Sequence, residues 1–394
     1  MTLADKDSAV RDRAPDILRG FALLGILFVN IPFMAILSEE GIRGEWVGGF
    51  FNGTASVIMF ALFAGKFYIL FSFLFGYSAN YIIKFDKRNR MRWIKRASVL
   101  VIFGILHFSL LWHGDILFLY GIFAFLLVPF LFRKDKTLKI WAIVLYSIFT
   151  FFLFASALSL IIAEKISSAD PQLSAESSLF DEIMKTGDFL SAIGPRIDLW
   201  SVGIVSAFFL QGGFVFAAFL TGLRLGRSKY LSQPTSELRS SKAVRIGLFV
   251  GLPIEIVIAV TAVLNEQSNQ TSDAIYFACI VLSFVFAPLL TRMYVVLILR
   301  VLERRPRSLM WLQPAGRMSL TVYISESVLA SLIFGPWGLG LFQKVEVWML
   351  FFIALGIWGF LNWCSTIWLR SHSQGPLESL LHLLTSGKNR MNQN

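Results

Sequence analysis

One stretch decides how this chain folds: residues 107–121, which read HFSLLWHGDILFLYG. It holds two of the four histidines, His107 and His113, together with Trp112 and Asp115, and it lies between two strongly apolar runs. Polar groups this dense are costly beside hydrocarbon and need a partner or a function. The stretch therefore predicts a tight hairpin between two membrane-spanning helices, with a polar site at its outer tip.

The composition around this hairpin is that of an integral membrane protein. Of the 394 residues, 56% are hydrophobic and 15% are charged, whereas soluble domains carry about 25% charged residues. Several apolar runs are about 20 residues long, which is enough for a helix to cross a bilayer. The predicted fold class is all-α: a polytopic membrane bundle of about ten transmembrane helices.

The apolar runs divide the chain into three parts. We expect a cytoplasmic arm (1–15), a transmembrane bundle (16–369) with an external acidic loop (164–197), and a cytoplasmic tail with a short interfacial helix (370–394). The ten expected spans are 16–37, 66–84, 93–112, 115–132, 140–163, 198–223, 244–264, 274–302, 316–334 and 346–369. The apolar segment 54–64 is too short to span alone, so it is interfacial, re-entrant or an extension of the following span.

The basic residues support this topology. The segments expected on the side of the termini hold 28 of the 36 Lys and Arg, and the opposite side holds five. Basic loops stay in the cytoplasm, so we expect a multi-pass protein of the cell inner (plasma) membrane with both termini cytoplasmic. Topology also explains the net charge of +11, so membrane lipids rather than nucleic acid are the expected partners. The sequence leaves the oligomeric state open.

His107 and Asp115 form the predicted catalytic pair. His107 lies about five residues before the outer end of its span, about 7–8 Å deep at 1.5 Å per residue, and Asp115 follows across the turn. A histidine that faces a carboxylate can act as a general base oriented by that carboxylate. The structural alternatives are that His107 bonds a neighbouring carbonyl, that Asp115 caps the next helix and that His113 is solvated in the turn.

Other polar residues are expected to bind substrate beside this pair. Asn30 ends the first span and Lys66 opens the second, both on the outer side, while Trp112 and Tyr120 belong to the hairpin. Topology alone thus brings Asn30 and Lys66 toward the catalytic pair in the outer third of the bilayer. Lys66 has an alternative, which is to extend its ammonium group to the membrane surface.

A second set of charged residues lies deeper. Asp16 and Arg19 are three residues apart, so they can pair on one helix face. Arg292, Glu255 and Glu326 fall inside predicted spans, where an isolated charge costs about 2.5–3.5 kcal/mol on insertion scales. We expect Arg292 to pair with one of the glutamates as a structural element. The functional alternative is a polar channel from the cytoplasm toward the hairpin.

Motifs for several other chemistries are missing. The sequence contains no phosphate-binding loop, no Rossmann glycine pattern and no Cys/His spacing typical of a metal site. The two cysteines, Cys279 and Cys364, lie inside predicted spans. We therefore expect no metal. The arginines around 300–307 have two interpretations, a solvated loop that sets topology or a site for an anionic cofactor or acidic lipid headgroups.

The residues resemble those of the YeiB family, the domain of unknown function numbered 418. The resemblance covers about residues 14–385, and its motifs stand at DILRGFALLGILFVN (16–30), KF to FG (66–76), the hairpin (107–120), GRMSLT with Tyr323 (316–323), GLGL (338–341) and GPLE (375–378). Three positions depart from the family pattern. Pro15 replaces an apolar residue, and Val322 and Glu326 stand where Asn and Gln are usual.

The resemblance implies an acyltransferase. The family is similar to polytopic enzymes that move an acyl group from cytoplasmic acyl-CoA to an acceptor across the membrane, often an envelope sugar. By this analogy His107 is the base or transient acyl carrier, Asp115 orients it, and Arg19 lies near the acyl-CoA donor. The acceptor is a small molecule or glycan.

Two other functions remain open on the residues alone. Glu255, Arg292 and Glu326, together with the prolines at 253 and 288, suggest a transporter or exporter of a small organic solute. A membrane scaffold or sensor without turnover is the third hypothesis.

Overall fold

A computed structural model describes residues 13–167, 178–232, 241–268 and 270–385, and these residues form helices and loops without a strand. The helices are α2 (Arg13–Ala35), α3 (Gly49–Leu62), α4 (Lys66–Ile83), α5 (Arg90–Leu110), α6 (Leu117–Leu127), α7 (Asp135–Ser167), α8 (Leu179–Thr186), α9 (Ile193–Arg227), α11 (Ser241–Ile246), α12 (Leu252–Glu266), α13 (Asp273–Arg304), α14 (Gln313–Arg317), α15 (Ser319–Phe334), α16 (Val347–Ser371) and α17 (Pro376–Thr385). The predicted all-α bundle is confirmed.

The described helices include eight that are long and apolar enough to cross a membrane. A ninth is the pair α14 and α15, which bends by 84° at its break. The predicted span 115–132 corresponds to a shorter apolar helix, Leu117–Phe130. By length and composition, the described residues thus hold eight or nine candidate spans, beside the second arm of the hairpin, which is 14 residues long.

The segment 54–64 belongs to the span that follows it. Gly49–Ile83 is one element of 35 residues in which α3 and α4 run on from each other with a short break. At 1.5 Å per residue such an element is about 50 Å long. The break, and with it the start of α4, therefore lies near the middle of the bundle.

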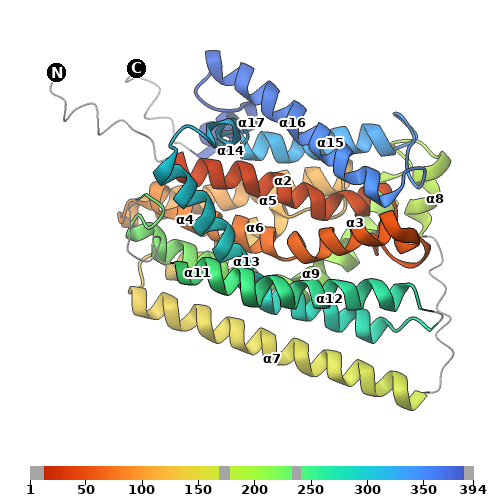
Figure 1. The fold of residues 1–394 in the computed structure, drawn as a ribbon. Coiled ribbons are helices and arrows are strands. Elements are labelled where there is room, and N and C mark those ends of the chain that lie inside the picture. Colours follow the sequence, from red (N-terminus) through yellow and green to blue (C-terminus); the bar gives the residue numbers. More distant parts are fainter. Residues whose placement is uncertain (1–12, 168–177, 233–240, 269, 386–394) are drawn as a thin grey trace.

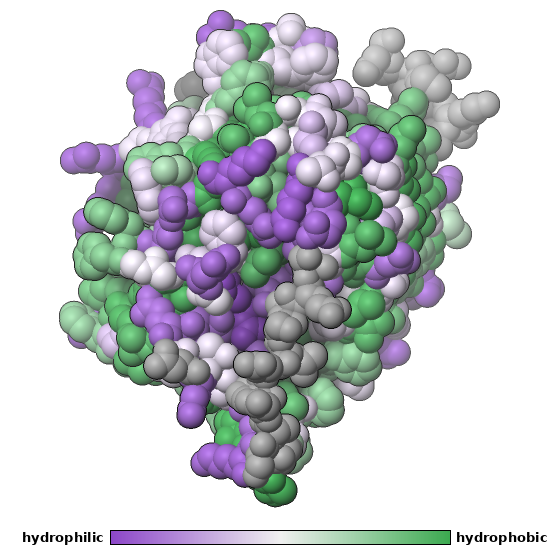
Figure 2. Space-filling view, turned by 90° about the vertical axis from the view of Figure 1, so that its right-hand side faces the viewer, coloured by the Kyte–Doolittle hydropathy of each residue, from purple (hydrophilic) through white to green (hydrophobic). Residues whose placement is uncertain are grey.

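The helices lie side by side along one direction, with α2 in the centre and α7 at the edge (Figure 1). The start of α2 and the tail helix α17 lie at one end, called the inner end below, and α8 lies at the opposite, outer end (Figure 1). The outer end carries many hydrophilic side chains gathered around a hollow centre (Figure 2). The expected short tail helix is present as α17, whose Leu381 is buried. Residues 1–12 and 386–394 of the expected arm and tail lie outside the described residues.

Two glycines allow the central helix to touch α14. A Cβ on Gly20 would lie 2.0 Å from the Leu312 carbonyl oxygen, and a Cβ on Gly316 would lie 1.7 Å from that of Asp16. Any larger side chain would force these backbones apart. Small residues permit such close helix contacts in membranes. The crossing fixes the bent α14–α15 unit against α2 and so determines where the face of α15 points.

Candidate functional site

The centre of the site is a buried row of three side chains from two separate helices and the hairpin turn. His107 Nε2 lies 2.9 Å from Ser327 Oγ, and His107 Nδ1 lies 2.8 Å from Asp115 Oδ1. The second contact is at ion-pair distance but its angle departs from an aligned hydrogen bond. His107 and Ser327 are each 2% exposed. Asp115 is 7% exposed, so all three side chains of the row are buried in the bundle.

The hairpin turn holds Asp115 in place. Asp115 Oδ2 accepts a hydrogen bond of 2.6 Å from the Phe118 N–H in the first turn of α6. The structural and functional interpretations of Asp115 are thus compatible, because its other oxygen faces His107. A Cβ at Gly114 would lie 2.2 Å from the ring of Trp112, so a larger residue there would displace that ring.

Tyr323 connects the turn to α15. Its hydroxyl accepts a 3.2 Å hydrogen bond from the Ile116 N–H, and its ring lies 5.1 Å from the ring of His107. Ser327 is one helical turn beyond Tyr323, so both residues face His107. Sequence reasoning did not identify Ser327. The only available signal was its spacing of four residues from Tyr323, which belongs to one of the family motifs.

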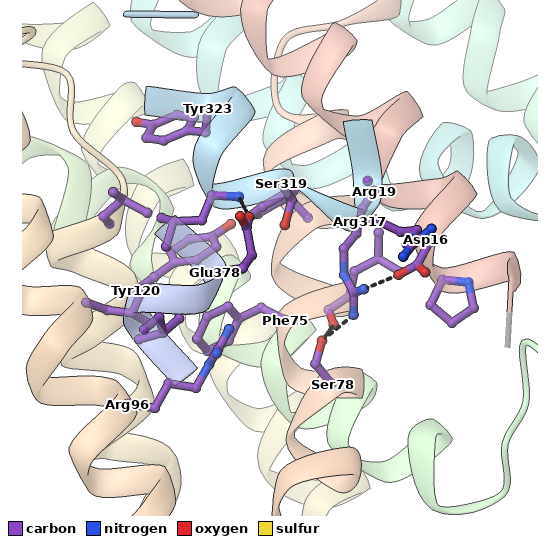
Figure 3. A pocket seen from close by; sticks show the side chains of 18 of the residues that line it. Asp16, Arg19, Phe75, Ser78, Arg96, Tyr120, Arg317, Ser319, Tyr323 and Glu378 are labelled. Atoms are coloured by element: carbon purple, nitrogen blue, oxygen red, sulfur yellow. Dashed lines mark hydrogen bonds and ion pairs between the residues drawn. The ribbon is translucent and has the colours of Figure 1, made fainter. Parts of the chain in front are cut away.

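An inner cavity of about 440 Å³ approaches this row from the inner end. It contains three arginines, Arg19, Arg96 and Arg317, against two carboxylates, Asp16 and Glu378. Figure 3 shows these side chains around the cavity, with Tyr120 and Tyr323 at its far side. The cavity is thus basic near its mouth and bounded by aromatic side chains at its depth.

Most of the charged side chains in this cavity have partners in the protein. Arg19 pairs with Asp16 at 2.8 Å, as expected from their spacing, and it also donates a 2.7 Å bond to Ser78 Oγ. Arg317 donates to the Ser373 carbonyl. Arg96 lies 6.0 Å from the centre of the Phe75 ring. An anionic ligand would therefore meet donor groups that are already positioned by neighbouring helices.

An outer cavity of about 500 Å³ approaches the same row from the opposite side. Three predicted substrate-binding residues line it, namely Asn30, Trp112 and Tyr120, and so does Asp115. The Tyr68 hydroxyl donates to Asn30 Oδ1, which fixes the amide at the cavity wall. Polar, charged and aromatic groups also contribute to the lining: Ser38, Glu39, Tyr68, His113, Asp198, Trp200 and Gln211.

The two cavities meet at shared side chains. Ile116 and Tyr120 line both of them, while Tyr323 lines only the inner and Asp115 only the outer cavity. Tyr120 is held by Ser72, whose Oγ lies 2.6 Å from its hydroxyl. Asp115 thus borders the outer cavity and Tyr323 the inner cavity, while His107 and Ser327 line neither cavity and are buried behind these two side chains.

Lys66 lies outside this site. It is fully buried at the start of α4, where its Nζ pairs with Glu255 Oε2 at 2.6 Å and donates to Ser283 Oγ. The expectation that Lys66 joins Asn30 at the outer side was based on a span that begins at residue 66. Because α3 precedes α4 in the same element, the residue lies in the middle of the bundle instead.

The two remaining predicted site residues also lie apart. Arg292 is exposed and lines a third cavity with Arg224. The expected pairing of Arg292 with a glutamate is not observed among the described ion pairs, since Glu255 is bound to Lys66. Glu326 is buried on α15 beside Ser327.

Helix α8 and the loop residue Ser38 cover the hairpin turn at the outer end. His113 lies 2.8 Å from the Ser38 carbonyl oxygen, and its ring packs edge-on at 5.6 Å against Phe180 of α8. Burial lowers the pKa of His113 to about 4. Burial also raises the pKa of Asp181, which accepts a bond from the Ser38 N–H. His113 is therefore a packing residue of this cover rather than a solvated one.

No metal centre is evident in the part of the chain that the structure describes. Within it, no group of three or more His, Cys, Asp or Glu side chains is arranged to hold a metal ion.

Comparisons with known proteins give a consistent result. Residues 225–388 match the model of the family described as "Protein of unknown function (DUF418)". Uncharacterized protein YxaH of Bacillus subtilis is 27% identical over 93% of this chain and 92% of its own length. Uncharacterized protein YeiB of Escherichia coli is 28% identical, with coverage of 94% and 95%. No solved structure matches.

Proposed function

The chain belongs to the DUF418 family of YeiB-like proteins, and from this premise we propose that it is an integral membrane acyltransferase. It would move an acyl group from a cytoplasmic acyl-CoA to an external or envelope acceptor. One observation carries the proposal: a buried histidine is paired with a carboxylate that lines the outer cavity, and this outer cavity meets the inner cavity at Ile116 and Tyr120.

The inner cavity has the chemistry that an acyl-CoA donor needs. Arg19, Arg96 and Arg317 would bind its phosphate groups, because guanidinium groups recognise phosphate through charge and paired N–H donors. The deeper apolar and aromatic wall would accept the acyl chain, with its thioester near Tyr120 and Tyr323. This placement agrees with a cytoplasmic inner end, which is the orientation that the 28 of 36 basic residues favour.

The outer cavity has the chemistry of an acceptor site. Trp112 and Trp200 offer ring faces to a sugar or another small hydroxylated molecule, and Asn30 and Asp198 offer polar groups at its wall. His107 would remove the proton of the attacking hydroxyl, and Asp115 would stabilise the imidazolium that forms. The acceptor class is therefore a hydroxyl-bearing small molecule or glycan.

The decisive experiment is transfer of label in liposomes. Purified protein is incubated with radiolabelled acetyl-CoA and envelope extract, beside His107→Ala and the control His382→Ala, which alters an exposed histidine of α17. We expect transfer by the wild type and by the control, and loss of at least a hundredfold in His107→Ala. A folded His107→Ala protein with unchanged transfer would overturn the proposal.

Solute transport is a second candidate function. Its supporting observation is that Tyr120 borders both cavities, as a gate between two access routes would. The same liposomes distinguish the two functions. Flux of a candidate solute without acyl-CoA would favour transport, whereas label transfer that requires His107 would favour acyl transfer.

A further inference from the structure

We propose that Ser327 is the nucleophile of this site and carries the acyl group covalently between the two cavities. This proposal rests on the proposed acyl transfer and adds a reaction intermediate to it. The supporting observation is the row Asp115–His107–Ser327, with contacts of 2.8 Å and 2.9 Å. A nucleophile within hydrogen-bond reach of a base, which is oriented in turn by a third group, is the arrangement that activates a serine.

The two ring nitrogens of His107 face the two groups that this chemistry requires. Nδ1 faces the carboxylate of Asp115, which favours a proton on that nitrogen. Nε2 then has a free lone pair directed at Ser327 Oγ. Because Asp115 is itself fixed by the Phe118 N–H, its negative charge stays beside Nδ1 and favours the tautomer that can accept the serine proton.

The orientation of Ser327 separates it from structural serines of this chain. Ser56, Ser78 and Ser365 each donate to the carbonyl oxygen four residues earlier in their own helix, which is the ordinary way to satisfy a hydroxyl in a membrane helix. The Ser327 hydroxyl instead contacts His107, across 220 positions of sequence. Ser327 is therefore in hydrogen-bond reach of a side chain that can act as a base.

The step balances with groups already named. His107 Nε2 takes the proton of Ser327, and Oγ attacks the thioester carbonyl of the donor. The carbon–sulfur bond breaks, and His107 returns the proton to the departing thiolate. The acceptor hydroxyl then gives its proton to His107 and attacks the serine ester. The ester bond to Ser327 breaks, and Oγ recovers the proton.

A covalent carrier would use the two cavities one after the other. The donor product would leave through the inner cavity before the acceptor arrives through the outer one, so the two substrates never have to meet. Tyr323 faces the inner side and Asp115 the outer side of the same row. The expected kinetic signature is a ping-pong pattern.

A fluorophosphonate probe tests the serine without any acyl donor. The probe forms a phosphorus–oxygen bond to an activated serine and releases fluoride. The full-length protein is labelled in nanodiscs, and the modified peptide is located by mass spectrometry. The variants are Ser327→Ala, His107→Ala and Ser331→Ala, a serine one turn further along α15 that accepts a bond from Trp337 instead. Thermal melting in each sample verifies folding.

We expect label on Ser327 in the wild type and in Ser331→Ala, at least tenfold less label in His107→Ala and none in Ser327→Ala. A folded wild type without label on Ser327, or labelling that does not depend on His107, would overturn the proposal. If Ser327→Ala does not fold, Ser327→Cys replaces it. Incubated with acetyl-CoA, that variant should retain a hydroxylamine-sensitive acetyl thioester at position 327, and its absence in the folded protein would also overturn the carrier.

The outcomes separate this inference from the proposed function. Label on Ser327 without transfer from acetyl-CoA would keep the reactive serine and reject the donor. Transfer from acetyl-CoA that persists in Ser327→Ala would keep the acyltransferase and reject the covalent carrier, leaving direct transfer assisted by His107.

Discussion

Glu378 of α17 binds Thr321 of α15 through a hydrogen bond of 2.6 Å between the threonine Oγ1 and the carboxylate Oε2. The other carboxylate oxygen accepts from the N–H groups of Leu320 and Thr321. A carboxylate at this position satisfies free donors at the start of a helix and opposes the positive end of its dipole. The tail therefore fastens the helix that carries Tyr323 and Ser327.

Loss of this contact should loosen α15. Glu378→Ala is expected to destabilise the protein by about 1–3 kcal/mol, because buried N–H donors lose their acceptor. Glu378→Gln keeps one carbonyl acceptor and should lose less. Thermal unfolding in detergent, followed by size-exclusion chromatography, measures the difference. Equal melting temperatures for Glu378→Ala and the wild type would contradict the role of the tail.

The crossing of α2 and α14 should not tolerate a methyl group. Gly316→Ala places a Cβ 1.7 Å from the Asp16 carbonyl oxygen, and such overpacking against backbone costs about 1–3 kcal/mol or more. Gly359→Ala in α16 is the matched control, since nothing lies within 4 Å of its added Cβ. We expect a large loss of thermal stability for Gly316→Ala and little change for Gly359→Ala. A similar effect of both substitutions would show that the crossing is not tight.

The buried pair of Lys66 and Glu255 should behave as a coupled unit. Lys66→Met leaves a buried carboxylate without its partner, which costs about 3–5 kcal/mol. The double variant Lys66→Met with Glu255→Gln removes both charges and should be more stable than Lys66→Met alone. A double-mutant cycle of unfolding in detergent gives the coupling energy. Additive losses would indicate that the two groups do not interact.

Asp115 should matter more for activity than for folding. Asp115→Asn keeps an oxygen that can accept from the Phe118 N–H, but it no longer stabilises a charged imidazole at His107. We therefore expect near-normal melting and a loss of about two to four orders of magnitude in acyl transfer. The liposome assay described above measures the rate. A fully active Asp115→Asn protein would restrict Asp115 to a helix-capping role.

Stability should decrease as the pH falls below neutrality, partly through His113. Burial lowers its pKa from 6.5 to about 4, so below pH 6.5 the unfolded chain binds a proton that the folded protein resists. The stability from the neutral ring is complete above pH 6.5 and is lost progressively between pH 6.5 and 4. Melting temperatures across this range should fall more steeply for the wild type than for His113→Asn. Parallel curves would show that His113 is not shielded.

The helical bundle and the His107–Asp115 contact could be predicted from the sequence, because both depend on residues that are close together in the chain. Span lengths follow from apolar runs, and the short connection between Leu110 and Leu117 leaves little choice about where Asp115 lies. Asn30 also lies in the outer cavity beside Asp115, as predicted, because topology alone sets the depth of a residue at the end of a span. The resemblance to the YeiB family is confirmed as well.

The site residues that the sequence analysis missed or misplaced depend on the rotation of helices and on contacts between distant segments. Ser327 reaches His107 only because the bend between α14 and α15 directs that face of the helix toward the hairpin. Lys66 was misplaced because the break between α3 and α4 resembles the start of a span. Arg292 has a plausible depth for pairing with Glu255, but pairing requires facing sides, and periodicity does not determine which neighbour a face meets.

The shared position of Tyr120 has an electrical consequence. A membrane can hold a voltage only if no continuous file of water crosses it, and here two hollows approach each other from opposite ends. The ring of Tyr120 lies 5.8, 5.4 and 5.1 Å from those of Phe71, Phe75 and Phe219. Where the two cavities share Tyr120, the barrier to water and ions is therefore a cluster of aromatic rings with the hydroxyl groups of Tyr120 and Ser72, and not lipid.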